Sequence, residues 1–311
     1  MDTFGFYRQM RRIRRLEETL LALKTSGEIL GSLHPCNGQE AVPVGAATAL
    51  RSDDYITATY RGHGWAVVAG ISLSDIFAEV LGRASNLNGG RGASPYFSGA
   101  SANFIGENSI VAAGLPIACG AALSAVRDGR SQVSLVSIGD GATNQGAAHE
   151  ALNIAAVMAL PLVVVVENNV YSEMSLISEM TRVVQLAERG AAYGIPATTI
   201  DGTDPTVVAG AVAEAVDRAR SGGGPTMVEA MVQRYVGHHS GDVQHYRPAG
   251  EVDRARADEP LARLRTAADA ATLATYDSID GEVDAEIDQA LAVARTIPEP
   301  DPSTVLDHVY V

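Results

Sequence analysis

The chain has 311 residues, 46% of them hydrophobic, and a formal net charge of −14. The length allows one large α/β domain or two ordinary ones, with enough apolar residues for a buried core. The acidic balance argues against binding to a nucleic-acid backbone, which requires clustered Lys and Arg. No apolar stretch reaches about 18 residues without a charge or a helix breaker, so we expect no membrane span.

The first residues are rich in arginine and amphipathic, as in transit peptides and in folded surface helices. Apolar side chains recur there at helical spacing, at Phe6, Met10, Ile13, Leu16 and Leu20. The adjacent glutamates at 17 and 18 are out of place in a transit peptide. We therefore expect a folded first helix.

Cysteine and lysine are scarce, which excludes several classes of catalytic and binding site. The two cysteines, Cys36 and Cys119, belong to no CxxC motif, so a reducing, cytoplasmic setting is expected. The single lysine, Lys24, follows no glycine, which excludes a phosphate-binding P-loop. It also lies in a poor context for the Schiff base of a pyridoxal phosphate enzyme.

The first third of the chain predicts helices around one short strand. Two helices are expected within residues 1–50, and a strand that ends at Tyr60-Arg61 follows them. A helix over 73–82 is capped by Ser72 or Ser74. Residues 83–109 are rich in Gly, Ser and Asn and predict a long loop, which in a compact domain is usually functional or disordered. A helix over 113–127 completes this part.

The middle of the chain alternates strands with helices. Strands are expected at 132–138, 162–166, 196–200 and 225–231, and helices at 144–159, 181–189 and 205–220. Such alternation predicts an α/β fold with a doubly wound parallel sheet and helices on both faces. The run Leu-Val-Val-Val-Val from Leu162 fits a strand that is buried on both sides.

The last part predicts a polar loop and then helices. The loop spans 233–255 and carries three histidines, and helices are expected at 259–270 and 281–296 before a Pro-rich tail. We find no internal repeat and no second domain. We therefore expect one α/β domain over 1–255 and a helical C-terminal extension over 256–311 that packs on it.

Two turns carry the strongest chemical signal. Gly139-Asp140-Gly141 follows one predicted buried strand, and Asn168-Asn169 follows the next, after an interval of 26 residues. Ligands of an open parallel sheet bind beyond the carboxyl ends of its strands. Carboxylate and amide oxygens suit magnesium, and glycines beside a helix start near Asn144 suit a phosphate. Together the turns predict a magnesium–diphosphate site.

The same two turns resemble the thiamine diphosphate motif. Further stretches share its context, in the order GQEAVPVGAATAL, YRGHG, LGRASNLNGGRG, GDGATNQG, EALNIAA, LPLVVVVENNVYS, DGTD and GHHSGD. In that order they resemble alpha subunits of the decarboxylating component of 2-oxo acid dehydrogenase complexes. The resemblance runs from about Tyr7 to the C-terminus. It implies an enzyme acting on pyruvate, a branched-chain 2-oxo acid or acetoin.

The resemblance implies roles for individual residues, and it makes residues 1–255 the thiamine diphosphate domain. Magnesium would be bound by Asp140, Asn169 and the carbonyl of Tyr171. The cofactor's diphosphate would lie against Gly139, Gly141, Ala142, Tyr60 and Arg61. Its aminopyrimidine ring would contact Ala112 and Leu115. The catalytic residues beside the thiazolium would be His63 and His238.

The remaining histidines are weaker candidates. His239 adjoins His238, and neighbours on a loop seldom both face a ligand. His149 is expected to be a solvated helix residue, and His245 with His238 is a weak zinc signal. His34 is either structural or close to the substrate channel.

The resemblance also implies partners. A separate beta subunit would supply the glutamate that activates the aminopyrimidine, in a unit of two alpha and two beta chains. The acyl group would pass to a lipoyl acyltransferase core. Neither a nucleic acid nor a membrane is expected as a partner.

Two departures keep other functions open. Ala93-Ser94-Pro95-Tyr96 stands where many relatives have Gly-Ser-Met-His, and the histidine loop mixes branched-chain and acetoin features. An acyloin-forming ligase built from the same two subunits is therefore an alternative within the enzyme class. A catalytically silent scaffold subunit is the alternative outside it.

Overall fold

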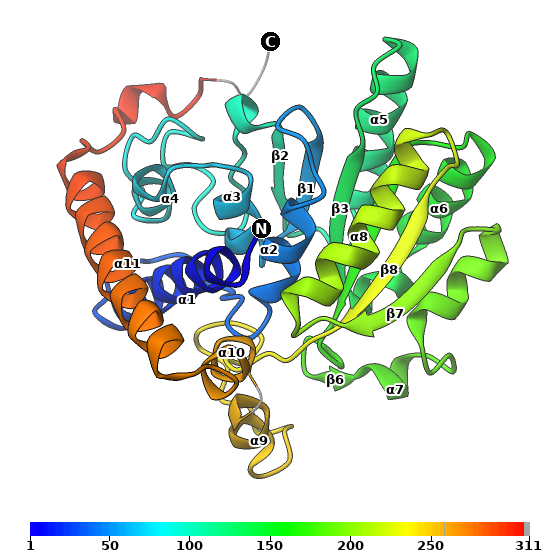
Figure 1. Cartoon of the computed structure of the whole chain (residues 1–311). Coiled ribbons are helices and arrows are strands. Elements are labelled where there is room, and N and C mark those ends of the chain that lie inside the picture. The colour runs from blue at the N-terminus through cyan, green and yellow to red at the C-terminus, as the bar shows by residue number, and fades with distance from the viewer. Residues whose placement is uncertain (258, 308–311) are drawn as a thin grey trace.

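The computed structural model describes residues 1–257 and 259–307. At its centre lies a six-stranded sheet in the order β2-β1-β3-β4-β8-β7, in which every pairing is parallel (Figure 1). Its strands are β1 (Tyr55–Thr59), β2 (Phe104–Asn108), β3 (Ser134–Gly139), β4 (Leu162–Asn168), β7 (Ala197–Asp201) and β8 (Thr226–Met231). A small antiparallel pair, β5 (Tyr171–Ser172) and β6 (Ser175–Leu176), follows β4.

Helices and short 3-10 segments make up the rest of the regular structure. The α-helices are α1 (Thr3–Thr25), α2 (Ala41–Ala47), α3 (His63–Val68), α4 (Leu73–Val80), α5 (Gly114–Arg127), α6 (Gly146–Val157), α7 (Ile177–Met180), α8 (Pro205–Arg220), α9 (Glu251–Ala257), α10 (Pro260–Thr266) and α11 (Ala270–Thr296). The 3-10 segments are η1 (Ala100–Ala102), η2 (Asp140–Asn144), η3 (Leu186–Tyr193) and η4 (Pro302–Thr304).

The sheet is covered on both faces, as the continuous apolar strand predicted. Along β4, Val163 and Val165 belong to one hydrophobic cluster, together with residues of α8, α2 and α1. Val164 and Val166 belong to a second cluster, together with residues of α5 and α6. Alternate side chains of one strand thus enter two separate cores. The predicted doubly wound parallel α/β fold is confirmed.

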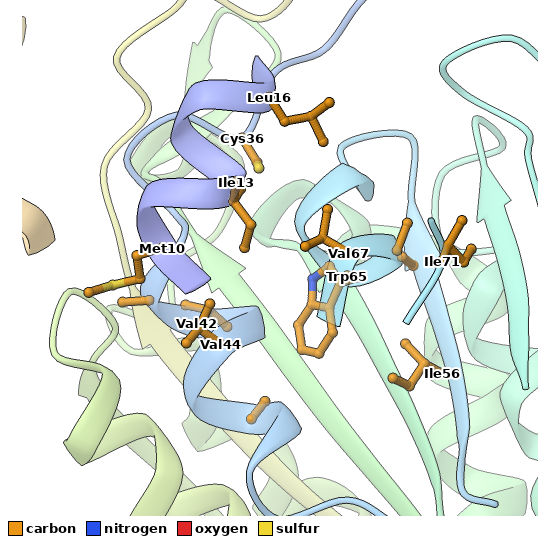
Figure 2. Packing of buried hydrophobic residues seen from close by; sticks show 14 of the residues in the cluster. Met10, Ile13, Leu16, Cys36, Val42, Val44, Ile56, Trp65, Val67 and Ile71 are labelled. Carbon is orange, nitrogen blue, oxygen red and sulfur yellow. The ribbon is translucent and has the colours of Figure 1, made fainter. Parts of the chain in front are cut away.

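The first helix is part of the larger core, as its periodicity predicted. Met10, Ile13 and Leu16 of α1 are fully buried in this cluster. Figure 2 shows Ile13 beside Trp65 of α3 and Met10 beside Val42 of α2. The predicted folded first helix is therefore confirmed as α1.

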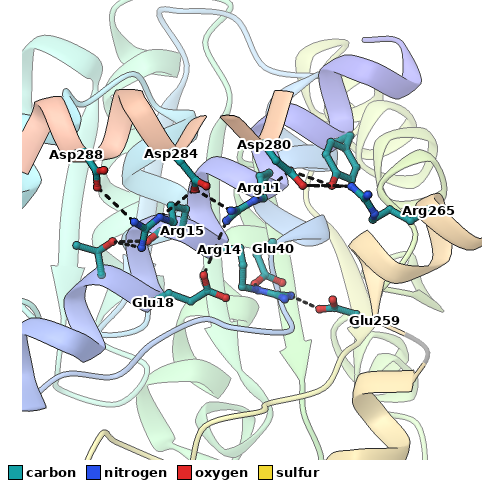
Figure 3. Close-up of polar contacts among 12 residues, drawn as sticks. Arg11, Arg14, Arg15, Glu18, Glu40, Glu259, Arg265, Asp280, Asp284 and Asp288 are labelled. Carbon is teal, nitrogen blue, oxygen red and sulfur yellow. Dashed lines mark hydrogen bonds and ion pairs between the residues drawn. The ribbon is translucent and has the colours of Figure 1, made fainter. Parts of the chain in front are cut away.

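Except for Arg14, the arginines of α1 face an acidic stripe on α11, which contacts α1 (Figures 1 and 3). Asp284 accepts from Arg11 at 2.8 Å and from Arg15 at 3.0 Å. Arg12 donates to Glu286 at 2.7 and 3.0 Å. The basic face of the first helix therefore forms ion pairs within the chain.

The C-terminal helices pack on the same core. Tyr276, Ile279, Val283 and Ile287 of α11 are buried within the larger cluster. This packing supports the predicted extension over 256–311, whose division from 1–255 stays a prediction. Positions 258 and 308–311 of that segment lie outside the described residues.

Several element predictions need correction. The predicted loop 83–109 contains β2, which adds an edge strand beside β1. The helix expected at 181–189 is instead the 3-10 segment η3, which begins at Leu186. The helix expected at 281–296 begins eleven residues earlier, at Ala270, where Asp269 caps it. The loop 233–255 ends in the first turns of α9.

The capping predictions are confirmed at two helices. Ser72 accepts from the backbone N–H of Asp75 at the start of α4. Asp204 accepts from the N–H of Thr206 at 2.8 Å, with Pro205 as the first residue of α8. Within the described ranges, no helix is long and apolar enough to cross a bilayer.

Candidate active site

A cavity of about 340 Å³ opens at the carboxyl ends of β1, β3 and β4. In the sheet register, Gly139 at the end of β3 pairs with Glu167 near the end of β4, so the two predicted turns are neighbours. The cavity is lined by residues from several parts of the chain: His34, Gln39, Ala58–Arg61, Asn108–Ala112, Gly114, Ser137–Ala142, Gln145, Glu167, Asn169, Tyr171–Glu173, Arg234 and His238. Nearly all the residues predicted for the magnesium–diphosphate site are therefore brought together.

Asp140 is the buried acid of this cavity. It follows β3 directly and is 2% exposed. One carboxylate oxygen accepts from the backbone N–H of Gly141 at 3.0 Å, whereas Oδ2 is buried and has no partner among the described residues. Burial raises the pKa of Asp140 to about 6, against the opposing effect of the Gly141 N–H and of Arg234. An unpartnered carboxylate oxygen in a buried cavity fits a cation ligand.

The two asparagines at the end of β4 have different roles. Asn168 has a structural role, since its amide donates to Glu229 at 2.7 Å and its oxygen accepts from the N–H of Val170. Asn169 lines the cavity, and its Oδ1 accepts from the N–H of Tyr171 at 3.3 Å. Val170, between Asn169 and Tyr171, has a φ of +63°, which is strained for a β-branched residue. The strained turn places Asn169 and Tyr171 at the cavity.

The metal site expected here has a mixed ligand set. It would combine one carboxylate, one amide oxygen and one backbone carbonyl. Across the described residues, no group of three or more His, Cys, Asp or Glu side chains is arranged to hold a metal. Oxygen donors of this kind suit magnesium that is shared with phosphate.

The glycines of the turn differ in what they allow. A Cβ on Gly139 would meet nothing within 4 Å. A Cβ on Gly141 would lie 2.3 Å from Oγ of Ser172, so this glycine is required by the close approach of β5. Gly141 is the second residue of η2, and α6 begins at Gly146, two residues later than predicted.

Arg61 lines the cavity and also joins two loops across it. Its Nη1 donates to the carbonyl of Pro35 at 2.6 Å, and its Nη2 donates to the carbonyl of His238 at 3.0 Å. The sequence predicted a phosphate contact for this side chain. The structure adds a second task, which is to hold the histidine loop against the segment around residue 35.

Two histidines face the cavity together. The rings of His34 and His238 have centroids 5.0 Å apart, and the ring of Tyr60 lies 4.6 Å from that of His34. Burial and then the charge of Arg61 lower the pKa of His34 to about 3 and that of His238 to about 4. Both imidazoles are therefore neutral near pH 7, and Nδ1 of His34 is buried without a partner in the described structure.

His63 is placed differently from the prediction. It begins α3, points into the core and does not line the cavity. Its Nδ1 lies 3.0 Å from both carboxylate oxygens of Glu17, and its Nε2 lies 2.9 Å from Oγ of Ser94. Both ring nitrogens are thus already occupied, so a direct contact with substrate does not follow from this geometry.

Of the two residues predicted to contact the aminopyrimidine ring, only one lines the cavity. Ala112 lines the cavity with a φ of +67°, which is unusual for alanine. Leu115 is fully buried beneath it in the second core cluster and does not line the cavity. The exposed side chains of Ile110 and Val111 take its place at the lining.

Sequence reasoning missed several polar residues of the cavity, among them Arg234, Gln39 and Glu167. Arg234 is buried and donates to the hydroxyl of Tyr246 at 2.7 Å, while its Nε has no partner among the described residues. It follows the end of β8 by three residues, so the strand-end rule should have identified it. Gln39 and Glu167 were missed because neither carries a motif of its own.

Comparison with known proteins identifies the family of the chain. Residues 8–303 match the family model described as "Dehydrogenase E1 component". The chain is 40% identical to the alpha subunit of acetoin:2,6-dichlorophenolindophenol oxidoreductase from Cupriavidus necator, over 98% of this chain and 93% of that protein. It is 37% identical to the pyruvate dehydrogenase E1 component subunit alpha of Rhizobium meliloti, over 100% of this chain and 90% of that protein. The chain therefore belongs to the dehydrogenase E1 component family, as its motifs predicted.

Proposed function

We propose that this chain is the alpha subunit of a thiamine diphosphate-dependent 2-oxo acid or acetoin dehydrogenase. Family membership supports the enzyme class, and the similarity to both acetoin and pyruvate enzymes leaves the substrate open. The observation that carries the proposal is the unpartnered, buried Oδ2 of Asp140 in a cavity that also contains Asn169.

The residues present fit the cofactor and its metal. Asp140, the amide oxygen of Asn169 and the carbonyl of Tyr171 would hold magnesium. Gly139, Gly141, Ala142, Tyr60 and Arg61 would hold the diphosphate, and Arg234 adds a second buried cation to the same cavity. Bound there, thiamine diphosphate would supply a carbanion and electron sink for cleavage next to the substrate carbonyl.

The chain's own histidines would handle substrate and protons. His34 and His238 are neutral and face the same space, so each can accept a proton or donate a hydrogen bond at a ring nitrogen. For His63 we propose a positioning role. Because it links Glu17 of α1 to Ser94 of the 83–109 segment, it holds that segment beside Tyr60 and Arg61.

Partners complete the proposal. A beta subunit would cover the cavity near Ile110 and Val111, which are 66% and 43% exposed, and would supply the activating glutamate. Two alpha and two beta chains would form the unit, and a lipoyl acyltransferase would accept the acyl group. The two free, buried cysteines are compatible with the proposed cytoplasmic setting.

The test uses the complex of this chain with its co-expressed beta subunit. Pyruvate, branched-chain 2-oxo acids and acetoin are supplied in turn, with magnesium, thiamine diphosphate and 2,6-dichlorophenolindophenol as the electron acceptor. We expect dye reduction with at least one substrate and its loss in Asp140→Ala, in a complex that still assembles. A well-formed complex that reduces no dye and binds no thiamine diphosphate would favour the scaffold alternative.

A further inference from the structure

A row of buried polar side chains leads from the core of the sheet to Asn169. The indole N–H of Trp65 donates to Oε1 of Glu167 at 2.8 Å, and the hydroxyl of Ser137 donates to the same oxygen. Nε2 of Gln39 donates to Oε2 of Glu167 at 2.6 Å. Nδ2 of Asn169 then donates to Oε1 of Gln39 at 3.3 Å. Every member of this row is less than a tenth exposed.

The chemistry of the groups fixes the direction of this row. An indole N–H can only donate, and a carboxylate can only accept. Gln39 must therefore turn its NH₂ group toward Glu167 and its oxygen toward Asn169. Asn169 must then turn its NH₂ group toward Gln39, which leaves its oxygen on the other side.

A second contact, at the other end of this row, supports the same orientation of the Asn169 amide. The backbone N–H of Tyr171, which can only donate, points at Oδ1 of Asn169. The carboxylate of Glu167, which can only accept, and the backbone N–H of Tyr171, which can only donate, thus agree on one orientation of the Asn169 amide. In this orientation the NH₂ group is occupied by Gln39, and the oxygen remains available to a ligand.

We propose that Glu167 and Gln39 are positioning residues that present the amide oxygen, rather than the NH₂ group, of Asn169 to the metal. This rests on the proposed function, in which Asn169 is a magnesium ligand. An unsupported asparagine amide can rotate by 180° at little steric cost, and its NH₂ group would repel a cation. Groups behind a metal ligand typically change metal affinity about 10–100-fold when they are removed.

The row also predicts the effect of an isosteric change. In Glu167→Gln the new amide keeps its oxygen toward Trp65 and Ser137, so its NH₂ group faces Gln39. Gln39 must then reverse, and its NH₂ group faces Asn169. Asn169 reverses in turn and presents its NH₂ group to the metal. Adding Gln39→Glu restores an acceptor at that position and turns Asn169 back.

The experiment measures Mn²⁺ affinity by electron paramagnetic resonance of free Mn²⁺, in the presence of thiamine diphosphate. It uses the complex of this chain with its beta subunit, as wild type, Glu167→Gln, Gln39→Leu, and the double variant Gln39→Glu/Glu167→Gln. Glu214→Gln is the matched control, because it removes one carboxylate from the exposed surface of α8. Thermal unfolding of the metal-free complexes checks that each variant is folded.

We expect Glu167→Gln and Gln39→Leu to weaken Mn²⁺ binding about 10-fold or more, and the double variant to return within about threefold of wild type. Gln39→Leu leaves the charge of Glu167 in place, so its weakening separates orientation from charge. Full affinity in Gln39→Leu, or no recovery in the double variant, would overturn the inference. Absence of Mn²⁺ binding in the wild-type complex would instead contradict the proposed function itself.

Discussion

The rings of His34 and His238 lie 5.0 Å apart at an interplanar angle of 76°, although one precedes the first strand and the other follows the last. Arg61 holds this arrangement, because it donates to the carbonyls of Pro35 and His238, the residues beside and within the pair. The cavity thus gains two neutral imidazoles from segments that no local motif connects.

Replacing His34 tests its place beside the reacting atoms. We expect His34→Gln to lower kcat about 100-fold or more and to leave the Kd of thiamine diphosphate nearly unchanged. Steady-state kinetics and calorimetry on the alpha–beta complex measure the two quantities. His149→Gln, on the exposed surface of α6, is the matched control and should keep full activity. Equal losses of kcat and cofactor affinity in His34→Gln would assign it a structural role.

The same two histidines should make the stability of the metal-free chain depend on pH. Burial, reinforced by Arg61, lowers the folded pKa of His34 to about 3 and that of His238 to about 4. Below about pH 6.5 the unfolded chain binds protons that the folded chain does not. The free energy of unfolding should therefore be full above pH 6.5 and fall as the pH drops toward 4.

Urea unfolding at pH 7 and pH 5 checks this direction. The decrease should be smaller in the double variant His34→Gln/His238→Gln than in wild type. An equal decrease in both proteins would mean that other groups cause the acid sensitivity.

Glu107 of β2 predicts the opposite pH dependence. Burial raises the pKa of its carboxyl well above the usual value, reinforced by nearby Glu17, and neither oxygen has a partner among the described residues. Because the folded chain holds the proton of Glu107 more tightly than the unfolded chain, the contribution of this group to the free energy of unfolding is highest below about pH 4.5. This stabilisation is lost as the pH rises through the folded pKa. Glu107→Gln should therefore stabilise the chain at pH 8, by on the order of 1 kcal/mol.

Thermal unfolding at pH 8 and pH 4.5 measures this difference. The gain in Tm should shrink at the lower pH, where Glu107 is protonated in the folded chain and about half protonated in the unfolded chain. Glu214→Gln, on the surface, serves as the control and should change Tm little at either pH. A lower Tm for Glu107→Gln at pH 8 would show that the carboxylate has a partner that this structure lacks.

The contact between α1 and α11 should weaken in salt. Asp284 accepts from both Arg11 and Arg15, so Asp284→Ala should cost about 1 kcal/mol of stability at low ionic strength. In 1 M NaCl, where the screening length is about 3 Å, the cost should fall. Gln289→Ala, on the exposed surface of α11, is the control. Urea unfolding at both salt concentrations checks the prediction, and a cost independent of salt would contradict it.

The sequence predicted the centre of the sheet and its turns because their signals are local. The apolar run of β4 and the polar turn after it are adjacent in the chain, so Asp140 and Asn169 were identified as neighbours in space. The edge strand β2 was missed because Phe104–Asn108 has few apolar residues and lies inside a Gly- and Ser-rich stretch.

The histidines show where local patterns fail. His63 lies in the matched motif YRGHG, but β1 ends at Thr59 and α3 begins at His63, which turns this side chain into the core. His34 reaches the cavity from a loop whose path depends on the packing of α1 and α2. The role of Gln39 and Glu167 could not be predicted, because it depends on a contact between residues far apart in the sequence.

Calorimetric titration of thiamine diphosphate with magnesium tests the central claim most directly. It is run on this chain alone, on its co-expressed beta subunit alone, and on the two together. We expect binding only to the pair, and its loss with a chelator and with Asp140→Ala. No binding to a well-formed pair, or binding that Asp140→Ala leaves intact, would contradict the assignment of this cavity to the cofactor.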